Sequence, residues 1–268
     1  MRGEENIHPT AVIDDGVELG DGCKVGPYAY LQRGAILGEN CLVHSHAVIK
    51  THARLGNAVE VGHFAVIGGN PQHLSFDTTI NSSVFIGSNT RLGEGVTIHR
   101  SIEKDCFTSI GRDCFLMGYT HVAHDCKLGD RVIMANGSLL GGHAEIGDDV
   151  FIGGGAAIHQ FVRIGLGAMI GGLAEISLEV APQLLVSGRN EVAGLNLVGL
   201  RRRNSKSEDI KELKQAYHLI MRDGNLIDHA QKILAEHGNE FSELTLGFAR
   251  FFIKSKRGYA RPHKRKSK

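Results

Sequence analysis

The sequence predicts a β-solenoid, a parallel β-helix built from hexapeptide repeats, followed by a small α-helical domain. Aliphatic residues recur at every sixth position through most of the first 180 or so residues. Glycine is abundant at 35 residues and proline scarce at 5, a balance typical of a chain with many tight turns. After about residue 185 the six-residue period gives way to a helical one. We therefore expect a β-helix over residues 1–187 and an α-helical domain over residues 188–268.

The six-residue period runs in two registers. The first extends from Ile7 to Ile67 without interruption, and the second from Ile86 to Ile176 with one skip at Lys104. A period of six fits neither an α-helix nor simple strand alternation, but it fits a coil with three flat sides, each a short strand and a turn. With coils about 4.8 Å apart, roughly ten of them form a prism about 45 Å long.

The register breaks at two places, over residues 69–83 and 99–108. Extra residues there must leave the coil as loops. Loops that project from a rigid scaffold are usual places for function. We expect substrate selectivity to depend on these two segments.

Helical periodicity marks the C-terminal part of the chain. Apolar residues spaced as on one helical face predict helices over 207–222, 226–236 and 240–254. Ser207 is expected to cap the first of them at its N-terminus, and Gly224 to stop it. Together these helices predict a small domain packed on the prism.

Composition narrows the classes of function. A net charge of +1 carries no nucleic-acid signature, and no apolar stretch is long enough for a signal peptide or a membrane span. The five cysteines lack CxxC spacing, so we expect reduced thiols in a cytoplasmic protein. Basic residues gather near the C-terminus and predict either a solvated tail or contact with an acidic partner. They are Lys256, Arg257, Arg261, Lys264, Arg265, Lys266 and Lys268.

Histidines gather at positions related by whole coils. The segment HVAHDC contains His121, His124 and Asp125. A step of 18 residues from position 124 reaches Gly142, next to His143. A second step reaches Gln160, next to His159. The repeat therefore predicts that these residues lie in adjacent layers along one edge of the prism.

This set of residues suits acyl transfer. A histidine with a neighbouring carboxylate can act as a general base, provided that His124 and Asp125 pair at a turn, and whether they do is open from sequence. The unhindered N–H of Gly142 can face an oxyanion. The other interpretations are imidazoles that decorate a solvated edge, a hexapeptide transferase that uses coenzyme A, a zinc carbonic anhydrase of the same repeat class, or a non-catalytic scaffold. We expect no metal site, because these histidines do not form a dispersed triad.

Several motifs resemble those of the UDP-N-acetylglucosamine O-acyltransferases. The resemblance covers nearly the whole chain, and three of its motifs, HVAHDC, IHQFVRIG and GLNLVGLRRR, are together highly specific within the hexapeptide class. They are IHPTAVID, NPQHL, VTIHRS, HVAHDC, GGHAEIG, IHQFVRIG and GLNLVGLRRR. It implies a left-handed β-helix, a homotrimer with active sites between subunits, and the first step of lipid A biosynthesis. It also implies a 3-hydroxyacyl donor carried as a phosphopantetheine thioester on acyl carrier protein, with no cofactor.

The resemblance also implies roles for individual residues. His124 is the expected general base at the sugar 3-position, supported by Asp125, with the Gly142 N–H as oxyanion donor. Gly172 is expected to leave room for the acyl chain. The expected substrate, nucleotide and phosphopantetheine contacts are His121, His143, His159, Gln160, Asn196, Arg202 and Arg203. Basic residues of the helical domain are expected to meet the acidic carrier protein.

The chain departs from the family pattern in its first loop. Where the family usually has PQDLK, this chain has His73 and Ser75 in place of the acidic residue and the lysine. Val198 likewise replaces an acidic residue that usually follows the family's asparagine. We count His73 among the substrate-binding residues. Some family members accept a 3-amino sugar, so both an oxygen and a nitrogen acceptor stay open.

Overall fold

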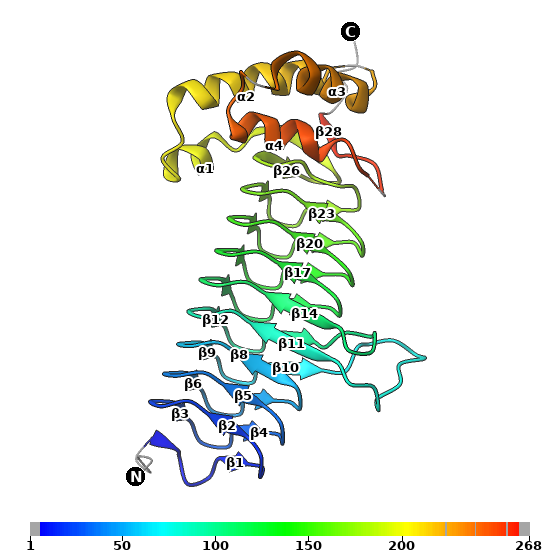
Figure 1. The fold of residues 1–268 in the computed structure, drawn as a ribbon. Helices are drawn as coiled ribbons and strands as arrows, with labels where there is room; N and C mark the ends of the chain where they lie inside the picture. The colour runs from blue at the N-terminus through cyan, green and yellow to red at the C-terminus, as the bar shows by residue number, and fades with distance from the viewer. Residues whose placement is uncertain (1–5, 223, 239, 256, 263–268) are drawn as a thin grey trace.

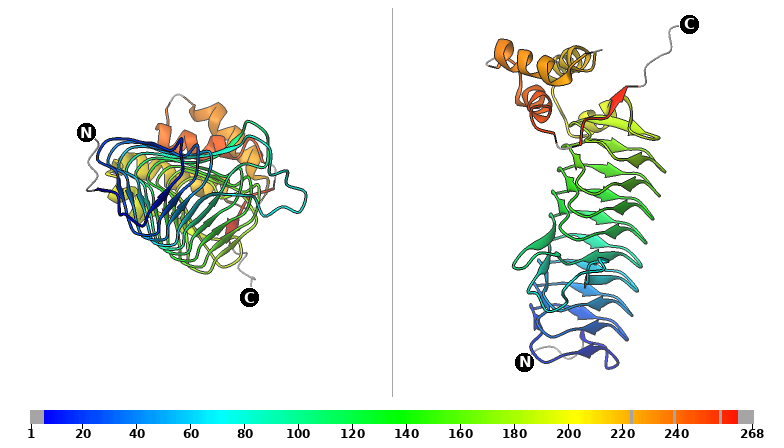
Figure 2. Two further views of the ribbon diagram at one scale, coloured as in Figure 1. Left: turned by 90° about the horizontal axis from the view of Figure 1, so that it is seen from below. Right: turned by 90° about the vertical axis from the view of Figure 1, so that its right-hand side faces the viewer.

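The chain coils into a triangular prism with helices at its C-terminal end (Figures 1 and 2). The computed structural model describes residues 6–222, 224–238, 240–255 and 257–262. Three sheets of very short strands form the faces of the prism, as the hexapeptide period predicts. Successive strands along the chain belong to successive faces, so each sheet is built from every third strand through most of the prism.

Each face is a stack of strands contributed by successive coils. Face 1 contains β1 (Val12–Ile13), β4 (Tyr30–Leu31), β7 (Val48–Ile49), β10 (Val66–Gly69), β13 (Thr97–His99), β16 (His121–Val122), β19 (Leu139–Leu140), β22 (Ala157–Ile158) and β25 (Glu175–Ile176). Face 2 contains β2 (Glu18–Leu19), β5 (Ile36–Leu37), β8 (Ala53–Leu55), β11 (Ser83–Ile86), β14 (Phe107–Ile110), β17 (Lys127–Leu128), β20 (Glu145–Ile146) and β23 (Arg163–Ile164). Face 3 contains β3 (Lys24–Val25), β6 (Leu42–Val43), β9 (Glu60–Val61), β12 (Arg91–Leu92), β15 (Phe115–Leu116), β18 (Ile133–Met134), β21 (Phe151–Ile152), β24 (Met169–Ile170), β26 (Leu184–Ser187), β27 (Glu191–Leu195) and β28 (Arg261–Pro262).

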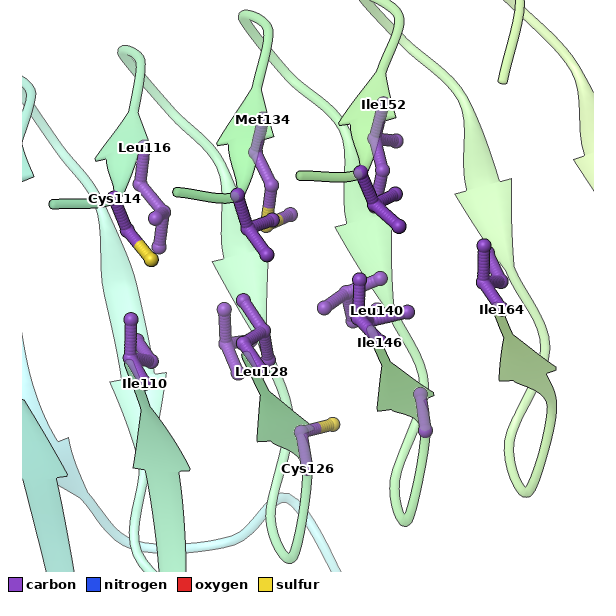
Figure 3. Packing of buried hydrophobic residues seen from close by; sticks show 14 of the residues in the cluster. Ile110, Cys114, Leu116, Cys126, Leu128, Met134, Leu140, Ile146, Ile152 and Ile164 are labelled. Atoms are coloured by element: carbon purple, nitrogen blue, oxygen red, sulfur yellow. The ribbon is translucent and has the colours of Figure 1, made fainter. Parts of the chain in front are cut away.

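Strand register confirms the coil length predicted from the repeat. On face 3, Leu116 pairs with Met134, and Met134 pairs with Ile152, each 18 positions further along the chain. All three side chains are fully buried inside the prism, where residues from successive coils stack in columns (Figure 3). Burial of these columns stabilises each coil, together with the backbone hydrogen bonds that link it to the next coil.

Two hydroxyl groups inside the prism are unsatisfied. Thr120 and Ser138 are fully buried, and neither hydroxyl has a hydrogen-bond partner within the described residues. Thr120→Val replaces the hydroxyl with a methyl group of similar size. We expect it to raise the free energy of unfolding by about 1 kcal/mol, because a buried unpaired polar group is removed.

The matched control is Thr90→Val. Thr90 is equally buried, but its hydroxyl donates to the Gly111 carbonyl at 2.9 Å and accepts from the Cys114 amide at 3.2 Å. This change should lower the free energy of unfolding by about 1–3 kcal/mol. Denaturant titration of both variants checks the pair, and a loss of stability in Thr120→Val contradicts the assignment.

Both breaks in the repeat lie on the same edge of the prism, between faces 1 and 2, which we call the loop edge. Residues 70–82 leave the coil between β10 and β11, and residues 100–106 leave it one coil later, between β13 and β14. The first loop projects furthest from the prism (Figure 1). Lys104, the skipped position of the repeat, lies in the second loop. The period therefore fails where chain is inserted at an edge, and the faces continue unbroken.

Within the residues that the structure describes, four helices cover the C-terminal end of the prism: α1 (Leu197–Arg202), α2 (Ser207–Ile220), α3 (Leu226–His237) and α4 (Glu243–Phe251). The sequence did not predict α1, a single short helix. Ser207 is the first helical residue of α2 and not its N-cap, which is Lys206 in an extended conformation. The expected cap was wrong because Ser207 already has helical geometry.

An ion pair stacked against an aromatic ring joins the helical part of the chain to the β-helix. The Arg163 guanidinium lies 2.6 Å from the fully buried carboxylate of Glu179 and 4.5 Å from the centre of the Phe251 ring in α4. The expected division between the β-helix and the helical domain, at residues 187 and 188, stays a prediction, and β27 lies beyond it on face 3.

Among the helices described, none has the length and apolar character that crossing a bilayer requires.

Candidate active site

His124 and Asp125 lie in the turn that follows β16, on the loop edge. Asp125 has a φ of 60°, a left-handed conformation that aspartate tolerates better than most residues. The turn brings the two neighbouring side chains together, whereas a strand would point them to opposite faces. His124 Nδ1 lies 2.8 Å from Asp125 Oδ2, and both side chains are largely buried. The pairing that the sequence left open is therefore present.

Gly142 lies directly beside the His124 ring, one coil further along. A Cβ atom at position 142 would lie 2.6 Å from His124 Cε1 and 2.7 Å from Nε2. Only glycine leaves room for the imidazole in this position. Within the described part of the chain, the Gly142 amide N–H has no hydrogen-bond acceptor. It is free to donate to a ligand next to His124.

Loop 100–106 provides two further hydrogen bonds to the Asp125 carboxylate. The Ser101 hydroxyl donates to Oδ1, and the Ile102 amide donates to Oδ2 at 3.2 Å. Burial raises the pKa of Asp125, but the hydrogen bonds from His124, Ser101 and Ile102 outweigh it and hold the pKa below the usual value. Asp125 is therefore a carboxylate. The sequence located this loop through its register break but could not identify which of its residues reach Asp125.

A groove of about 320 Å³ lies beside Asp125, between the loop edge and face 2, and His124 does not line it. His143 and Phe161 occupy the turn positions one and two coils beyond Asp125, and their rings are stacked with centres 4.5 Å apart. Gln160 and His159 are exposed in the same coil as Phe161. The structure thus brings the predicted loop-edge residues into one column. The groove is lined by Glu103, Asp105, Cys106, Phe107, Asp125, Lys127, His143, Glu145, Phe161 and Arg163.

His121 lies in β16 on face 1, just before the turn that holds the His124–Asp125 pair. Its Nδ1 is 2.7 Å from the Thr97 hydroxyl, and its ring meets the edge of the His99 ring with centres 4.7 Å apart. Burial, together with the nearby His121 and His124, lowers the pKa of His99 to about 4. Burial also lowers the pKa of His121. His99, which the sequence interpretation did not single out, therefore supports this side of the site as a neutral ring.

His99 predicts a loss of stability on acidification. Its pKa is about 4 when folded against an ordinary value of 6.5, so the unfolded chain binds more protons between these values. Stability is therefore full above pH 6.5 and falls as the pH drops towards 4, by roughly 3 kcal/mol from this group. Thermal melts of wild type and His99→Gln over this range check it. A variant whose melting temperature falls as steeply as that of wild type contradicts the assignment.

The other predicted residues lie away from the dyad. His73 is exposed in loop 70–82 on the loop edge. Gly172 lies in the turn between β24 and β25, on the edge between faces 3 and 1. Arg202 is exposed in α1, whereas the Arg203 guanidinium lies beside Gly167, on the edge between faces 2 and 3. One chain therefore distributes the predicted residues over all three edges.

Asn196 and Arg203 are both engaged within the chain. The Asn196 side chain caps α1 by accepting from the Gly199 amide at 2.9 Å, and it donates to the Gly167 carbonyl at 3.0 Å. Arg203 donates to the Gln183 side chain. Burial lowers the pKa of Arg203, with the nearby Arg131 adding to the effect. Both residues therefore shape the start of the helical part.

The dyad and His143 also have the composition of a metal site. Ligand atoms of His124, Asp125 and His143 all lie within 4.8 Å of one another. Both Asp125 oxygens already accept hydrogen bonds from the protein, and His124 Nδ1 is one of the donors. A metal ion would have to displace these bonds, so the arrangement fits a proton-transfer pair better than a ligand set.

Comparison with known proteins identifies the family. Over 254 residues, which are 94% of this chain and 95% of the relative, the sequence is 39% identical to the acyl-[acyl-carrier-protein]–UDP-N-acetylglucosamine O-acyltransferase of Campylobacter lari. The chain belongs to the UDP-N-acetylglucosamine O-acyltransferase family. Residues 179–260 match the family model described as UDP N-acetylglucosamine O-acyltransferase, domain 2, and residues 107–142 match the bacterial transferase hexapeptide model.

Solved structures of UDP-N-acetylglucosamine acyltransferases share the whole fold. The Campylobacter jejuni structure has a TM-score of 0.89 and 37% identity, covering 96% of this chain and 100% of its own. The Francisella novicida structure has a TM-score of 0.91 and 29% identity, covering 96% of this chain and 95% of its own. Membership of the acyltransferase family confirms the left-handed parallel β-helix with a helical C-terminus.

Proposed function

We propose that this protein transfers a 3-hydroxyacyl group from acyl carrier protein to the 3-position of UDP-N-acetylglucosamine or its 3-amino analogue, the first step of lipid A biosynthesis. The main support is the His124–Asp125 pair, bonded at 2.8 Å next to the free amide of Gly142. The chain carries this pair in a fold shared with relatives named for that activity. The enzyme acts in the cytoplasm and needs no cofactor beyond the phosphopantetheine thioester of its donor.

His124 performs the proton transfers. The bond to Asp125 requires the proton on Nδ1, which leaves Nε2 as the base. Nε2 takes the proton of the sugar 3-hydroxyl, or 3-amine, as that atom attacks the thioester carbonyl. The oxyanion that forms accepts from the Gly142 N–H. When the carbon–sulfur bond breaks, His124 returns its proton to the departing thiolate, so the product is an ester or amide and a free thiol. Asp125 stabilises the transient imidazolium.

The proposed substrate contacts come from more than one copy of the chain. His121, His143, His159 and Gln160 lie on or beside the loop edge, whereas Gly172 lies on another edge. A homotrimer with sites between subunits brings the loop edge of one subunit against the Gly172 edge of the next. There the small Gly172 leaves room for the acyl chain. Arg202 and Arg203 then contact the nucleotide or phosphopantetheine phosphates, with Asn196 holding α1 in place.

Acyl carrier protein is the acidic partner for the basic C-terminal residues. Arg257 and Arg261 are described, and their guanidinium groups donate to the carbonyls of Gln160 and Gly224. This places Arg257 next to the C-terminal end of the loop edge. Lys256, Lys264, Arg265, Lys266 and Lys268 lie outside the described residues.

The choice of donor tests the proposal. Purified protein, treated with a chelator, is given UDP-N-acetylglucosamine with a 3-hydroxyacyl thioester of either acyl carrier protein or coenzyme A. We expect free thiol from the carrier-protein donor at a rate that the chelator leaves unchanged. Preference for the coenzyme A donor supports a different hexapeptide transferase, and loss of activity on chelation supports a metal enzyme; either result contradicts the proposal.

A further inference from the structure

Two consecutive polar residues, Arg100 and Ser101, are buried where β13 ends at the loop edge. Their exposed fractions are 6% and 0%. A buried arginine beside a buried serine is costly to fold unless both are fully hydrogen-bonded. Their partners differ, since Arg100 is bonded to loop 70–82 and Ser101 to Asp125.

Ser101 is bonded to the catalytic carboxylate. Its hydroxyl donates to Asp125 Oδ1 and accepts from the Glu103 amide at 2.9 Å. The order Ser101–Asp125–His124 resembles a nucleophilic triad but differs in connection, because the serine bonds the carboxylate and not the imidazole. Ser101 is also sealed from solvent. It is therefore placed to hold Asp125 and not to attack a substrate.

Arg100 is bonded to loop 70–82 at several points. Its guanidinium donates to the Asn70 side chain at 3.1 Å and to the carbonyls of Thr78 and Ile80 at 2.8 and 2.7 Å. The Phe76 ring lies 4.9 Å from its central carbon. Within the described residues no carboxylate lies at ion-pair distance from this guanidinium. Neutral acceptors in one loop therefore satisfy a buried cation, which fixes the shape of that loop.

A third buried residue joins the two sets of contacts. The Ser82 hydroxyl, where loop 70–82 rejoins the coil, donates to the Ser101 carbonyl at 2.7 Å. It also lies 3.3 Å from an Arg100 nitrogen. A continuous buried network therefore runs from the first loop through residues 100 and 101 to Asp125 and His124.

We propose that Arg100 and Ser101 are positioning residues of the acyltransferase: Ser101 orients Asp125 for His124, and Arg100 holds loop 70–82 in place over the sugar. The inference rests on the proposed function, in which His124 is the base, and on the expectation from the sequence that His73 of loop 70–82 binds the sugar. We expect changes at the two residues to affect different kinetic constants. Ser101 acts on the His124–Asp125 pair and so on kcat, whereas Arg100 acts on loop 70–82 and so on KM for the sugar.

Several titratable groups surround Asp125 and bear on any pH readout. His124 and His143 face its carboxylate, the latter at 3.9 Å, and Cys126 is the next residue, with its pKa raised to about 12 by burial. The groove adds further charged groups: Glu103, Asp105, Lys127, Glu145 and Arg163. All of them are common to wild type and the variants below, so a difference between profiles reports on the residue changed.

Ser101→Ala tests the contact with Asp125. Without the hydroxyl the carboxylate loses a donor, so the His124–Asp125 pair binds its proton more tightly. We expect the acid limb of the kcat profile to move up by about one pH unit and kcat to fall about tenfold, with KM for the UDP-sugar unchanged. Ser138→Ala is the matched control, since Ser138 is equally buried but its hydroxyl has no partner among the described residues. The control should keep the wild-type profile.

Arg100→Lys tests the contact with the loop. Lysine keeps the charge but cannot donate to several acceptors at once, so the loop loses its fixed shape. We expect KM for the UDP-sugar to rise about tenfold while kcat at saturating sugar and the acid limb stay as in wild type. Asn70→Ala, which removes one of the acceptors, should shift KM in the same direction and covers the case in which Arg100→Lys does not fold. Arg91→Lys, at an exposed arginine of face 3, is the matched control.

The outcomes separate this inference from the proposed function. A folded Ser101→Ala enzyme with a wild-type profile and rate overturns the role of Ser101. An unchanged KM in Arg100→Lys or Asn70→Ala overturns that of Arg100. If both inferences fail while His124→Ala is inactive, the proposed function stands without them. If His124→Ala keeps near-normal activity, the proposed function itself fails.

Discussion

His124→Ala should lower kcat/KM by roughly 10³-fold while leaving the β-helix folded. The imidazole is hydrogen-bonded to a carboxylate at 2.8 Å and keeps its other ring nitrogen free, whereas His143 lies 3.9 Å from the same carboxylate. Without His124, the base that takes the proton of the attacking sugar atom and returns it to the thiolate is lost. Initial rates of thiol release, measured with circular dichroism on the same preparation, check this result.

His237→Ala is the matched control for that change. His237 lies at the end of α3, half exposed and paired with Glu240 at 3.1 Å, on the helical part of the chain. It should retain wild-type turnover. A His124→Ala protein with near-normal rate, or an equal loss in the control, contradicts the assignment of the base.

Gly142→Ala should lower kcat/KM by at least about 10²-fold, because it acts on the base and the oxyanion donor together. The added methyl carbon would lie 2.6 Å from the His124 ring, which must then rotate out of line with Asp125 or displace the coil beside it. Either movement separates His124 Nε2 from the Gly142 amide. Steady-state rates and melting temperature measured together distinguish lost chemistry from lost folding.

Gly247→Ala gives the comparison that isolates this effect. Gly247 lies within α4, and a Cβ there would meet no atom within 4 Å. Alanine in a helix interior should stabilise the protein by up to about 1 kcal/mol and leave the rate unchanged. Wild-type activity in Gly142→Ala would contradict the proposed geometry of the site.

The repeat made most of the prism predictable. A residue every six positions fixes the three faces, and a step of 18 fixes which residues stack. The sequence alone therefore places His124 and Gly142 side by side, as the structure has them. The same arithmetic separates His124 from Gly172, since 48 residues is not a whole number of coils. Periodicity thus indicated which residues lie beside His124, whereas the homotrimer was implied by the family resemblance and stays a proposal.

Features outside the period were not predictable in the same way. The bonds from Ser101 and Ile102 to Asp125 depend on the path of an inserted loop, which has no repeat to fix it. The cap formed by Asn196 belongs to a short helix with too few residues to show an apolar face. These contacts decide how firmly the dyad and α1 are held, and only the three-dimensional structure shows them.

The identity of the product tests the central claim most directly. Wild-type protein is incubated with a 3-hydroxyacyl carrier protein and either UDP-N-acetylglucosamine or its 3-amino analogue, and the nucleotide-sugars are examined by mass spectrometry and NMR. We expect one added 3-hydroxyacyl group at the sugar 3-position, with one equivalent of carrier-protein thiol released. Recovery of both sugars unchanged, with the thioester intact or hydrolysed to free acid, would contradict it.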